Sequence, residues 1–373
     1  YFQMFDAHEQ LCGGFVWEWC DHAIFKGSAS NGKAMYWYGG DHGETQHDGN
    51  FCMDGLVYPD RTPHTGLKEY KNVHRPARIV SYDQATGIAT LRNYMDFENL
   101  QDVAFIRYEA TCDGDVTSYG EILELPSIPA RSEGTVEIPV EVPAKGRCYL
   151  KVTYFCKLTS SLIPTEHELG FDEIELQNTD NRNQKNAAFI GEKVEGVLSV
   201  DEDDCTLTVT GPDFSYTLNK LTGLWDAMIF NGKPLITRPM NLNIWRAPTD
   251  NDMYIKQEWI RAHYDRTITR GYEVTYENAD GVVNIHSTLS MSAETVQRML
   301  DVAVHWTINA AGILEMSMST LRNPEFPDLP RFGLRLFLPE EMNQVTYYGL
   351  GPNESYADKH RASSHGLYTA KVA

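Results

Sequence analysis

The sequence predicts a mainly all-β protein with one immunoglobulin-like sandwich and a second β-rich region. Between residues 77 and 178, short runs alternate apolar and polar side chains, and turn signals at 112–115 and 144–146 separate them at the spacing of a sandwich. A similar pattern returns after residue 191, where only residues 254–264 have helical spacing. The length of 373 residues is enough for two to three domains.

The elements follow in order along the chain. Residues 1–3 resemble the remnant of a cleavable expression tag and are left out of the fold prediction. Residues 4–76 are rich in Gly, Trp, His and carboxylates without a simple period, and irregular segments of this kind often carry binding and catalysis. The first β-rich region predicts strands that include 88–91, 104–108, 135–140 and 149–154.

The polar stretch 178–186 has no apolar anchor, and we place the linker at 179–190. The second β-rich region then predicts a tight hairpin turn at Asn231-Gly232. Its predicted strands include 206–209, 214–218, 282–286, 302–306 and 314–318.

Composition limits the partners and the compartment. The chain has 32 Lys+Arg and 52 Asp+Glu, a net charge of −20, which argues against nucleic acid and anionic membranes as partners. No apolar run reaches the roughly 18 residues of a spanning helix, and there is no signal-peptide pattern. Seven cysteines without CxxC pairs favour free thiols, and we expect the cytoplasm rather than the periplasm.

Aromatic and acidic residues gather in three segments, 13–22, 38–44 and 50–55. Indole rings beside carboxylates suit a sugar, because the C–H face stacks on the ring and the hydroxyls donate to the acids. Residue types alone nominate Glu18 and Asp21 as a catalytic pair for glycoside hydrolysis. The alternative is that Glu18 alternates with Trp17 and Trp19 along a strand and faces the other way.

A zinc site can be drawn from neighbouring polar residues, but its spacing matches no standard ligand pattern, which favours polar loop residues. The residues of this alternative are Asp41, His42, His47 and Asp48.

Motifs spread along the chain resemble β-galactosidases of glycoside hydrolase family two. Residues 13–19 (GGFVWEW), 38–41 (YGGD) and 51–64 (FCMDGLVYPDRTPH) resemble the end of the catalytic barrel. Residues 245–252 (WRAPTDND) and 348–358 (YGLGPNESYAD) resemble two motifs of the large carboxy-terminal sandwich. The resemblance covers essentially the whole chain after residue 3.

The resemblance implies a domain order and an activity. Residues 4–76 would be the last strand and helix of a (β/α)₈ barrel, 77–178 the immunoglobulin-like sandwich, and 191–373 the first part of a large antiparallel sandwich. The intact enzyme would be a retaining hydrolase of terminal β-D-galactosyl bonds, as in lactose, and a homo-oligomer. Both catalytic glutamates of the family precede the matched segment, so we expect no catalytic residue in this chain and no activity of the chain alone.

The resemblance also implies binding residues in the barrel segment. Trp17 matches a tryptophan that forms a wall of the galactose pocket. Phe51, through its carbonyl, and Asp54, through its side chain, match positions that hold Na⁺ or K⁺, although many relatives carry Asn at the second position. His47 falls where relatives place an Asn near the catalytic Mg²⁺, although an ordinary loop histidine is the favoured interpretation. We expect these ions in the intact enzyme, and none firmly bound to this chain alone.

Arg246 and Asp252 are the remaining candidate substrate-binding residues. Their loop contacts the far side of the substrate pocket in the family, but stapling of the loop by Asp250 and Asp252 is the favoured interpretation.

Three other residues receive structural roles. The resemblance makes Glu18 a structural acid. Trp19 is expected to pack in a core and Arg61 to anchor an ion pair.

Two other functions stay open. The chain could be a non-catalytic carbohydrate-binding or oligomer-assembly module. It could also belong to another family-two glycosidase such as a β-glucuronidase, although shorter relatives of that kind lack the motifs at 246–252 and 349–358.

Overall fold

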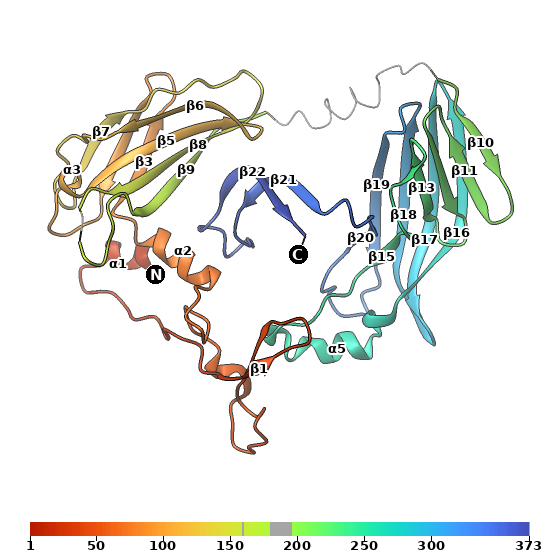
Figure 1. Ribbon diagram of the computed structural model, residues 1–373, viewed down its shortest axis with the longest axis horizontal. Coiled ribbons are helices and arrows are strands. Elements are labelled where there is room, and N and C mark those ends of the chain that lie inside the picture. Colours follow the sequence, from red (N-terminus) through yellow and green to blue (C-terminus); the bar gives the residue numbers. More distant parts are fainter. Residues whose placement is uncertain (159, 180–195, 373) are drawn as a thin grey trace. The chain divides into compact units, whose positions relative to one another are not determined.

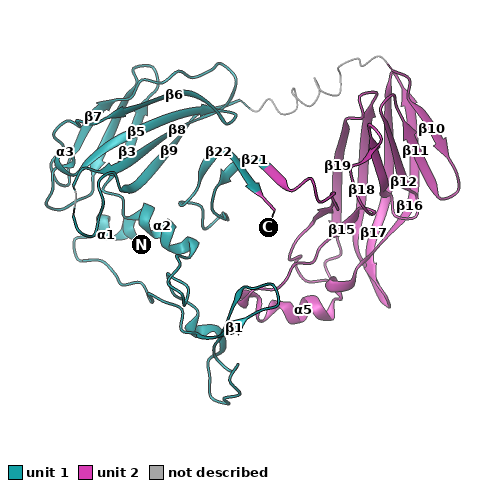
Figure 2. Cartoon of the chain, in the orientation of Figure 1, with its two compact units in different colours: residues 1–180, 346–370 teal, residues 181–345, 371–373 magenta. Residues whose placement is uncertain are grey.

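The computed structural model describes residues 1–158, 160–179 and 196–372. The chain divides into two compact units, shown in different colours in Figure 2. Unit 1 comprises residues 1–180 and 346–370, and unit 2 comprises residues 181–345 and 371–373. Apart from Thr179, the predicted linker 179–190 lies outside the described residues. None of the helices in the described ranges is both long and apolar enough to cross a membrane.

The first part of unit 1 contains short elements joined by irregular chain. The helix expected within residues 4–76 is present as α2, whereas the strand expected in the same segment does not form strand pairing at residues 13–19. The backbone there bonds a loop instead, since Glu18 N donates to the Asp54 carbonyl at 3.2 Å and Leu56 N to the Glu18 carbonyl at 3.0 Å. A β-strand needs a partner strand beside it, and the described residues provide none along this stretch. The elements are α1 (Phe2–Ala7), β1 (Ile24–Ser28), β2 (Ala34–Trp37), η1 (Gly49–Cys52) and α2 (Thr65–Val73).

Residues 1–3, whose sequence resembles the remnant of an expression tag, take part in the fold. Phe2 belongs to α1, and its ring lies 4.7 Å from that of His74 and 6.2 Å from that of Tyr70. The aromatic contact places α1 against the end of α2.

The predicted immunoglobulin-like sandwich follows as two antiparallel sheets, seen in Figure 1. One sheet has the order β3-β4-β7, and the other has the order β6-β5-β8-β9. Alternate residues of each strand face a shared core, which includes Leu91, Ile106, Leu150 and Tyr154, all fully buried. The elements are β3 (Ala77–Asp83), β4 (Ile88–Asn93), α3 (Leu100–Val103), β5 (Ala104–Cys112), β6 (Asp115–Ile122), β7 (Glu133–Glu137), β8 (Gly146–Cys156) and β9 (Glu168–Thr179).

A hairpin from late in the sequence completes unit 1. It is formed by β21 (Gln344–Gly351) and β22 (Ser364–Lys371), and residues 346–370 cluster with the sandwich. The His365 ring stacks on Tyr149 of β8 at 4.0 Å between centroids, and its Nδ1 lies 2.7 Å from Glu173 Oε1 of β9. These contacts attach the hairpin to the four-stranded sheet.

Unit 2 is a second antiparallel sandwich. A five-stranded sheet with the order β10 to β14 and a four-stranded sheet with the order β16 to β19 share one core, which includes Trp225 and Trp306. The predicted turn at Asn231-Gly232 is confirmed, because both residues have the positive φ that a tight hairpin of this kind requires. The helix predicted at 254–264 is confirmed as α5 with a 3₁₀ turn after it.

The elements of unit 2 are β10 (Ser199–Glu202), β11 (Thr206–Thr210), β12 (Phe214–Asn219), β13 (Leu224–Phe230), β14 (Lys233–Pro234), β15 (Asn241–Asn243), η2 (Asp250–Asp252), α5 (Ile255–Arg261), η3 (Tyr264–Arg266), β16 (Ile268–Ala279), β17 (Val282–Ala293), β18 (Val296–Asn309), β19 (Leu314–Arg322) and β20 (Gly333–Arg335).

Candidate functional site

Trp17 lies at a large hollow on unit 1. The hollow has a volume of about 1120 Å³ and is lined by aromatic side chains of α1, of α2 and of the segment between them, together with Glu69 and Arg75. Trp17 is 76 % exposed, and Phe15 beside it is fully exposed. An indole held in this way offers a ring face to a ligand.

Trp19 does not pack in a core as the sequence predicts. It is 60 % exposed, because no described element covers that side of the segment. The prediction of core packing for Trp19 is therefore wrong in this structure.

The two carboxylates nominated from residue types have separate partners. Glu18 Oε1 lies 3.2 Å from His22 Nε2. Asp21 is buried, and it accepts a hydrogen bond from Gly55 N at 2.9 Å while its second oxygen lies 2.7 Å from His64 Nε2. Asp21 thus ties the segment around Trp17 to the loop that contains Asp54. The two acids do not form a free pair that could attack a glycosidic bond.

Asp54 has an oxygen suited to a cation. Its Oδ1 is buried and has no hydrogen-bond partner among the described residues. A buried carboxylate oxygen without a donor is costly unless a cation or water meets it. Phe51 lies three residues earlier in η1, with its ring 70 % exposed. The side chain of Asp54 therefore fits one ligand of a monovalent cation, while the position of the Phe51 carbonyl as a second ligand stays a prediction.

His47 is held by the loop in which it lies. Its Nδ1 accepts a hydrogen bond from Gly49 N at 3.1 Å, which leaves Nε2 to carry the proton of the neutral ring. A side chain at Gly40 would bring a Cβ within 2.7 Å of this ring, so glycine is needed there. Within the described ranges, no three His, Cys, Asp or Glu side chains gather in a way that could hold a metal ion. The residues present therefore do not form a Mg²⁺ site, or the zinc alternative, by themselves.

The loop that contains Arg246 and Asp252 lies in unit 2 and is stapled internally. The Arg246 guanidinium donates to both oxygens of Asp252, with Nη2 at 2.9 Å from Oδ1. Thr249 N and Oγ1 donate to the same carboxylate at 2.8 and 3.1 Å. The hydrogen bonds from Arg246 are the main reason why the pKa of Asp252 is lowered to about 2. This geometry matches stapling by Asp252. Stapling by Asp250, and direct sugar contact by Arg246 or Asp252, stay predictions.

Arg61 does not anchor an ion pair among the described residues. Its Nη1 donates to the Pro59 carbonyl at 2.9 Å and contacts the Cys20 sulfur. The prediction of an ion pair is wrong, because the turn directs the guanidinium at a backbone carbonyl.

The contact between Asp21 and His64 is not predicted from the sequence. The two residues are 43 positions apart, and no local spacing indicates such a pair.

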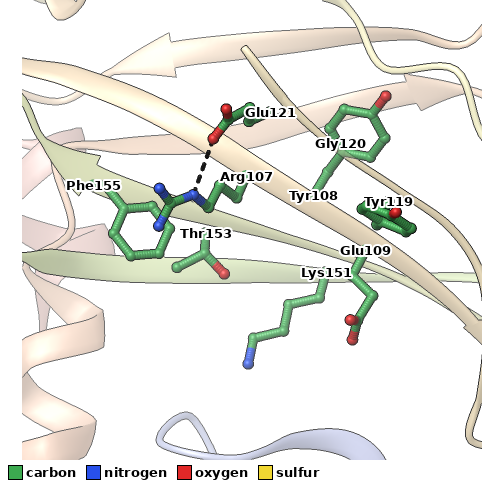
Figure 3. Close-up of a pocket in the computed structure, with 9 residues that line it drawn as sticks. All are labelled: Arg107, Tyr108, Glu109, Tyr119, Gly120, Glu121, Lys151, Thr153 and Phe155. Atoms are coloured by element: carbon green, nitrogen blue, oxygen red, sulfur yellow. Dashed lines mark hydrogen bonds and ion pairs between the residues drawn. The ribbon is translucent and has the colours of Figure 1, made fainter. Parts of the chain in front are cut away.

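A second hollow lies on the four-stranded sheet of the immunoglobulin-like sandwich, as Figure 3 shows. It has a volume of about 550 Å³. Arg107 bonds Glu121 at 3.2 Å, and its guanidinium carbon lies 4.8 Å from the Phe155 ring centre. The Arg107 guanidinium therefore covers one face of the Phe155 ring. Tyr119, which also lines this hollow, is 82 % exposed.

Three family models match consecutive parts of the chain. "Glycosyl hydrolases family 2, TIM barrel domain" matches residues 1–79, "Beta-galactosidase, domain 4" residues 89–177, and "Beta galactosidase small chain" residues 210–373. Together with the β-sandwiches, these matches define the class of protein: the chain belongs to glycosyl hydrolase family 2.

Within this family the chain is similar to β-galactosidases along its whole length. It is 40 % identical to a β-galactosidase of Actinobacillus pleuropneumoniae over 100 % of this chain and 36 % of the relative. It is 32 % identical to a β-galactosidase of Staphylococcus xylosus over 96 % of this chain and 35 % of the relative. It is 29 % identical to a β-galactosidase of Kluyveromyces lactis over 100 % of this chain and 34 % of the relative. The chain thus spans about a third of the length of the curated relatives it matches.

Proposed function

We propose that this chain is part of a retaining β-galactosidase that hydrolyses terminal β-D-galactosyl bonds. Its contribution to the site is binding. The observation that carries the proposal is the exposed indole of Trp17 at the edge of the large hollow, within the segment matched by the TIM-barrel model. In a (β/α)₈ barrel, substrate residues gather at the carboxyl ends of strands.

The role of Trp17 follows from its ring. The apolar face of galactose stacks on the indole, and the sugar hydroxyls stay free to meet polar groups of the rest of the pocket. The contact between Asp21 and His64 holds the backbone on both sides of the loop, so it fixes the segment from which Trp17 projects. Trp17 thus orients the sugar, and the glutamates that act on the bond are expected outside this chain.

Asp54 is proposed as a ligand of a Na⁺ or K⁺ ion beside the sugar. A hard monovalent cation supplies positive charge that binds and orients sugar hydroxyls. The unpartnered, buried Oδ1 of Asp54 supports this proposal. A Mg²⁺ ion near His47 would need ligands from outside the described residues.

We propose further that the chain alone has no turnover. The carboxylates closest in sequence to Trp17 are both occupied, Glu18 by His22 and Asp21 by His64 and Gly55. Neither is free to act as a nucleophile or as a general acid.

The test compares the full-length protein that contains this sequence with the chain alone. The full-length protein should hydrolyse a nitrophenyl β-galactoside faster than a nitrophenyl β-glucuronide, and the first sugar detected by NMR should be the β anomer. The chain alone should release no nitrophenol above buffer. Hydrolysis of the glucuronide in preference, an α anomer formed first, or clear turnover by the chain alone would each contradict the corresponding part of the proposal.

The ion ligand is tested in the same assay. Asp54→Ala should raise the Na⁺ concentration that gives half-maximal activity, whereas Asp54→Asn should retain most of the response because the amide keeps an oxygen ligand. Exposed Glu9→Ala provides a control without effect. An unchanged Na⁺ dependence in Asp54→Ala would reject Asp54 as a ligand.

A further inference from the structure

Two cysteines of the immunoglobulin-like sandwich lie side by side. Cys112 is the last residue of β5 and Cys148 lies near the start of β8, and the antiparallel register pairs them directly. Their sulfurs are 2.8 Å apart, with the Cys148 thiol directed at the Cys112 sulfur. All seven cysteines of the chain are free thiols in this structure.

The backbone geometry is compatible with a bond between them. Directly opposed residues of antiparallel strands have Cα atoms about 4.5 to 5.5 Å apart, which lies within the range of about 4.4 to 6.8 Å found for disulfides. A bond length of about 2.05 Å requires the sulfurs to approach by less than about 1 Å. Small side-chain rotations therefore suffice, and the strands need not separate.

The surroundings of the pair keep this arrangement. A side chain at Gly146 would place its Cβ 2.5 Å from the Cys112 sulfur, so the glycine leaves the space that this thiol fills. Cys112 is partly exposed, and its thiol also donates to the Lys145 carbonyl at 3.3 Å. Cys148 is only 1 % exposed.

The two thiols differ in their access to an oxidant. Burial, and then the neighbouring Cys112 thiol, raise the pKa of Cys148 to about 12, so Cys148 stays protonated at neutral pH. Cys112 is the partner that solvent reaches. An oxidant should therefore react at Cys112 first, and Cys148 then acts as the resolving thiol.

We propose that Cys112 and Cys148 are a redox modification site, at which a peroxide converts the two thiols into a reversible intramolecular disulfide. In the first step the Cys112 sulfur attacks a peroxide oxygen, the O–O bond breaks, and a sulfenic acid and water form. In the second step the Cys148 sulfur attacks the sulfenic sulfur while its thiol proton passes to the departing oxygen, so that the S–S bond forms, the S–O bond breaks, and water leaves. The two electrons lost by the thiols reduce the peroxide, and a thiol reductant reverses the bond.

The bridge would form beside the β21–β22 hairpin. A Cβ at Gly114 would lie 3.1 Å from the Tyr348 ring and 3.3 Å from Leu367, and the Tyr348 hydroxyl donates to the Arg147 carbonyl at 3.5 Å. Oxidation would therefore join the ends of β5 and β8 at the place where this hairpin packs. The unfolded chain would lose freedom in the loop closed by the two cysteines, which are 36 positions apart, and this loss stabilises the folded unit.

The experiment treats the purified, folded 373-residue chain with hydrogen peroxide, blocks the remaining thiols, and digests it with trypsin without reduction. The predicted product joins peptide 108–131, which contains Cys112, to peptide 148–151, which contains Cys148, with loss of two hydrogens. Dithiothreitol should separate the peptides. The oxidised chain should also unfold at a temperature several degrees higher than the reduced chain.

The variants are matched on the same strands. Cys112→Ser and Cys148→Ser should each abolish the linked peptide and the shift in unfolding temperature. Cys156→Ser, which removes another buried thiol of β8, should retain both. The inference is overturned if peroxide converts Cys112 to a sulfinic acid while Cys148 stays alkylatable. It is also overturned if the linked peptide forms no more readily in the folded chain than in urea.

Discussion

The Arg246–Asp252 pair allows a quantitative test of how the loop in unit 2 is held. The change is Asp252→Asn, which removes the charge but keeps one oxygen that can accept from Thr249. The Asp252 side chain is 12 % exposed, and lowering its pKa from 3.8 to about 2 corresponds to about 2 kcal/mol of stability at neutral pH. Because the Arg246 side chain is 29 % exposed and partly screened, we expect a loss of about 1 to 2 kcal/mol.

The assay is urea unfolding followed by tryptophan fluorescence. Trp225, Trp259 and Trp306 are buried in unit 2, whereas Trp17 and Trp19 of unit 1 are largely exposed. The fluorescence change therefore reports mainly the unfolding of unit 2. Asp280→Asn is the matched control, because Asp280 lies in an exposed turn between β16 and β17 with a positive φ that Asn also tolerates.

The pH dependence gives the same pair a second test. The pKa of Asp252 is lower in the folded protein than its ordinary value of 3.8, so the stabilisation is complete above that value and is lost as the pH falls toward 2. The difference in unfolding free energy between wild type and Asp252→Asn should therefore shrink between pH 6 and pH 2.5. Equal urea midpoints at neutral pH, or a difference that does not shrink, would show that the Arg246–Asp252 pair does not stabilise unit 2.

Two further predictions concern the anchoring of α2 and a histidine pair. Asn72→Ala removes the bonds to Phe171 N and the Arg361 carbonyl, at 2.7 and 2.9 Å, and should destabilise unit 1 by about 2 kcal/mol, measured as faster hydrogen exchange in α2 and β22. Burial, and then the stacked His286 ring 4.2 Å away, lower the pKa of His305 below 6.5. Stability should therefore fall as the pH drops below about 6.5, and His305→Phe should flatten that fall in urea titrations at pH 7.5 and 5. A wild-type stability that rises over this interval would contradict the second prediction.

The β-sandwiches could be predicted from the sequence because their signals are local. Alternation along a strand follows from the two-residue period of side chains, and it identified the runs now seen in β4, β5, β8, β11, β12, β17, β18 and β19. The Asn231-Gly232 turn needs a positive φ at both residues, which these two residue types tolerate. Segments whose structure depends only on such rules were predicted well.

The barrel segment could not be predicted in the same way. Whether residues 13–19 form a strand depends on the presence of neighbouring strands. The burial of Trp19 and the partners of the Arg61 guanidinium depend on which elements pack against them. Motif resemblance pointed to Trp17 and Asp54, but the contact between Asp21 and His64 joins residues far apart in the sequence. The pairing of Cys112 with Cys148 likewise required the strand register, because the two residues are 36 positions apart.

The proposed function depends most on Trp17 as the wall of a galactose pocket, and a single measurement tests this role. It is kcat/KM for a nitrophenyl β-galactoside in the full-length protein that contains this sequence, for wild type and Trp17→Ala, with Trp37→Phe as an aromatic control. Loss of a stacked indole removes about 1.4 kcal/mol or more of sugar binding, so kcat/KM should fall at least about tenfold for Trp17→Ala and stay near wild type for the control. A value for Trp17→Ala within about twofold of wild type would contradict this role of Trp17, because a twofold change corresponds to less than about 0.5 kcal/mol.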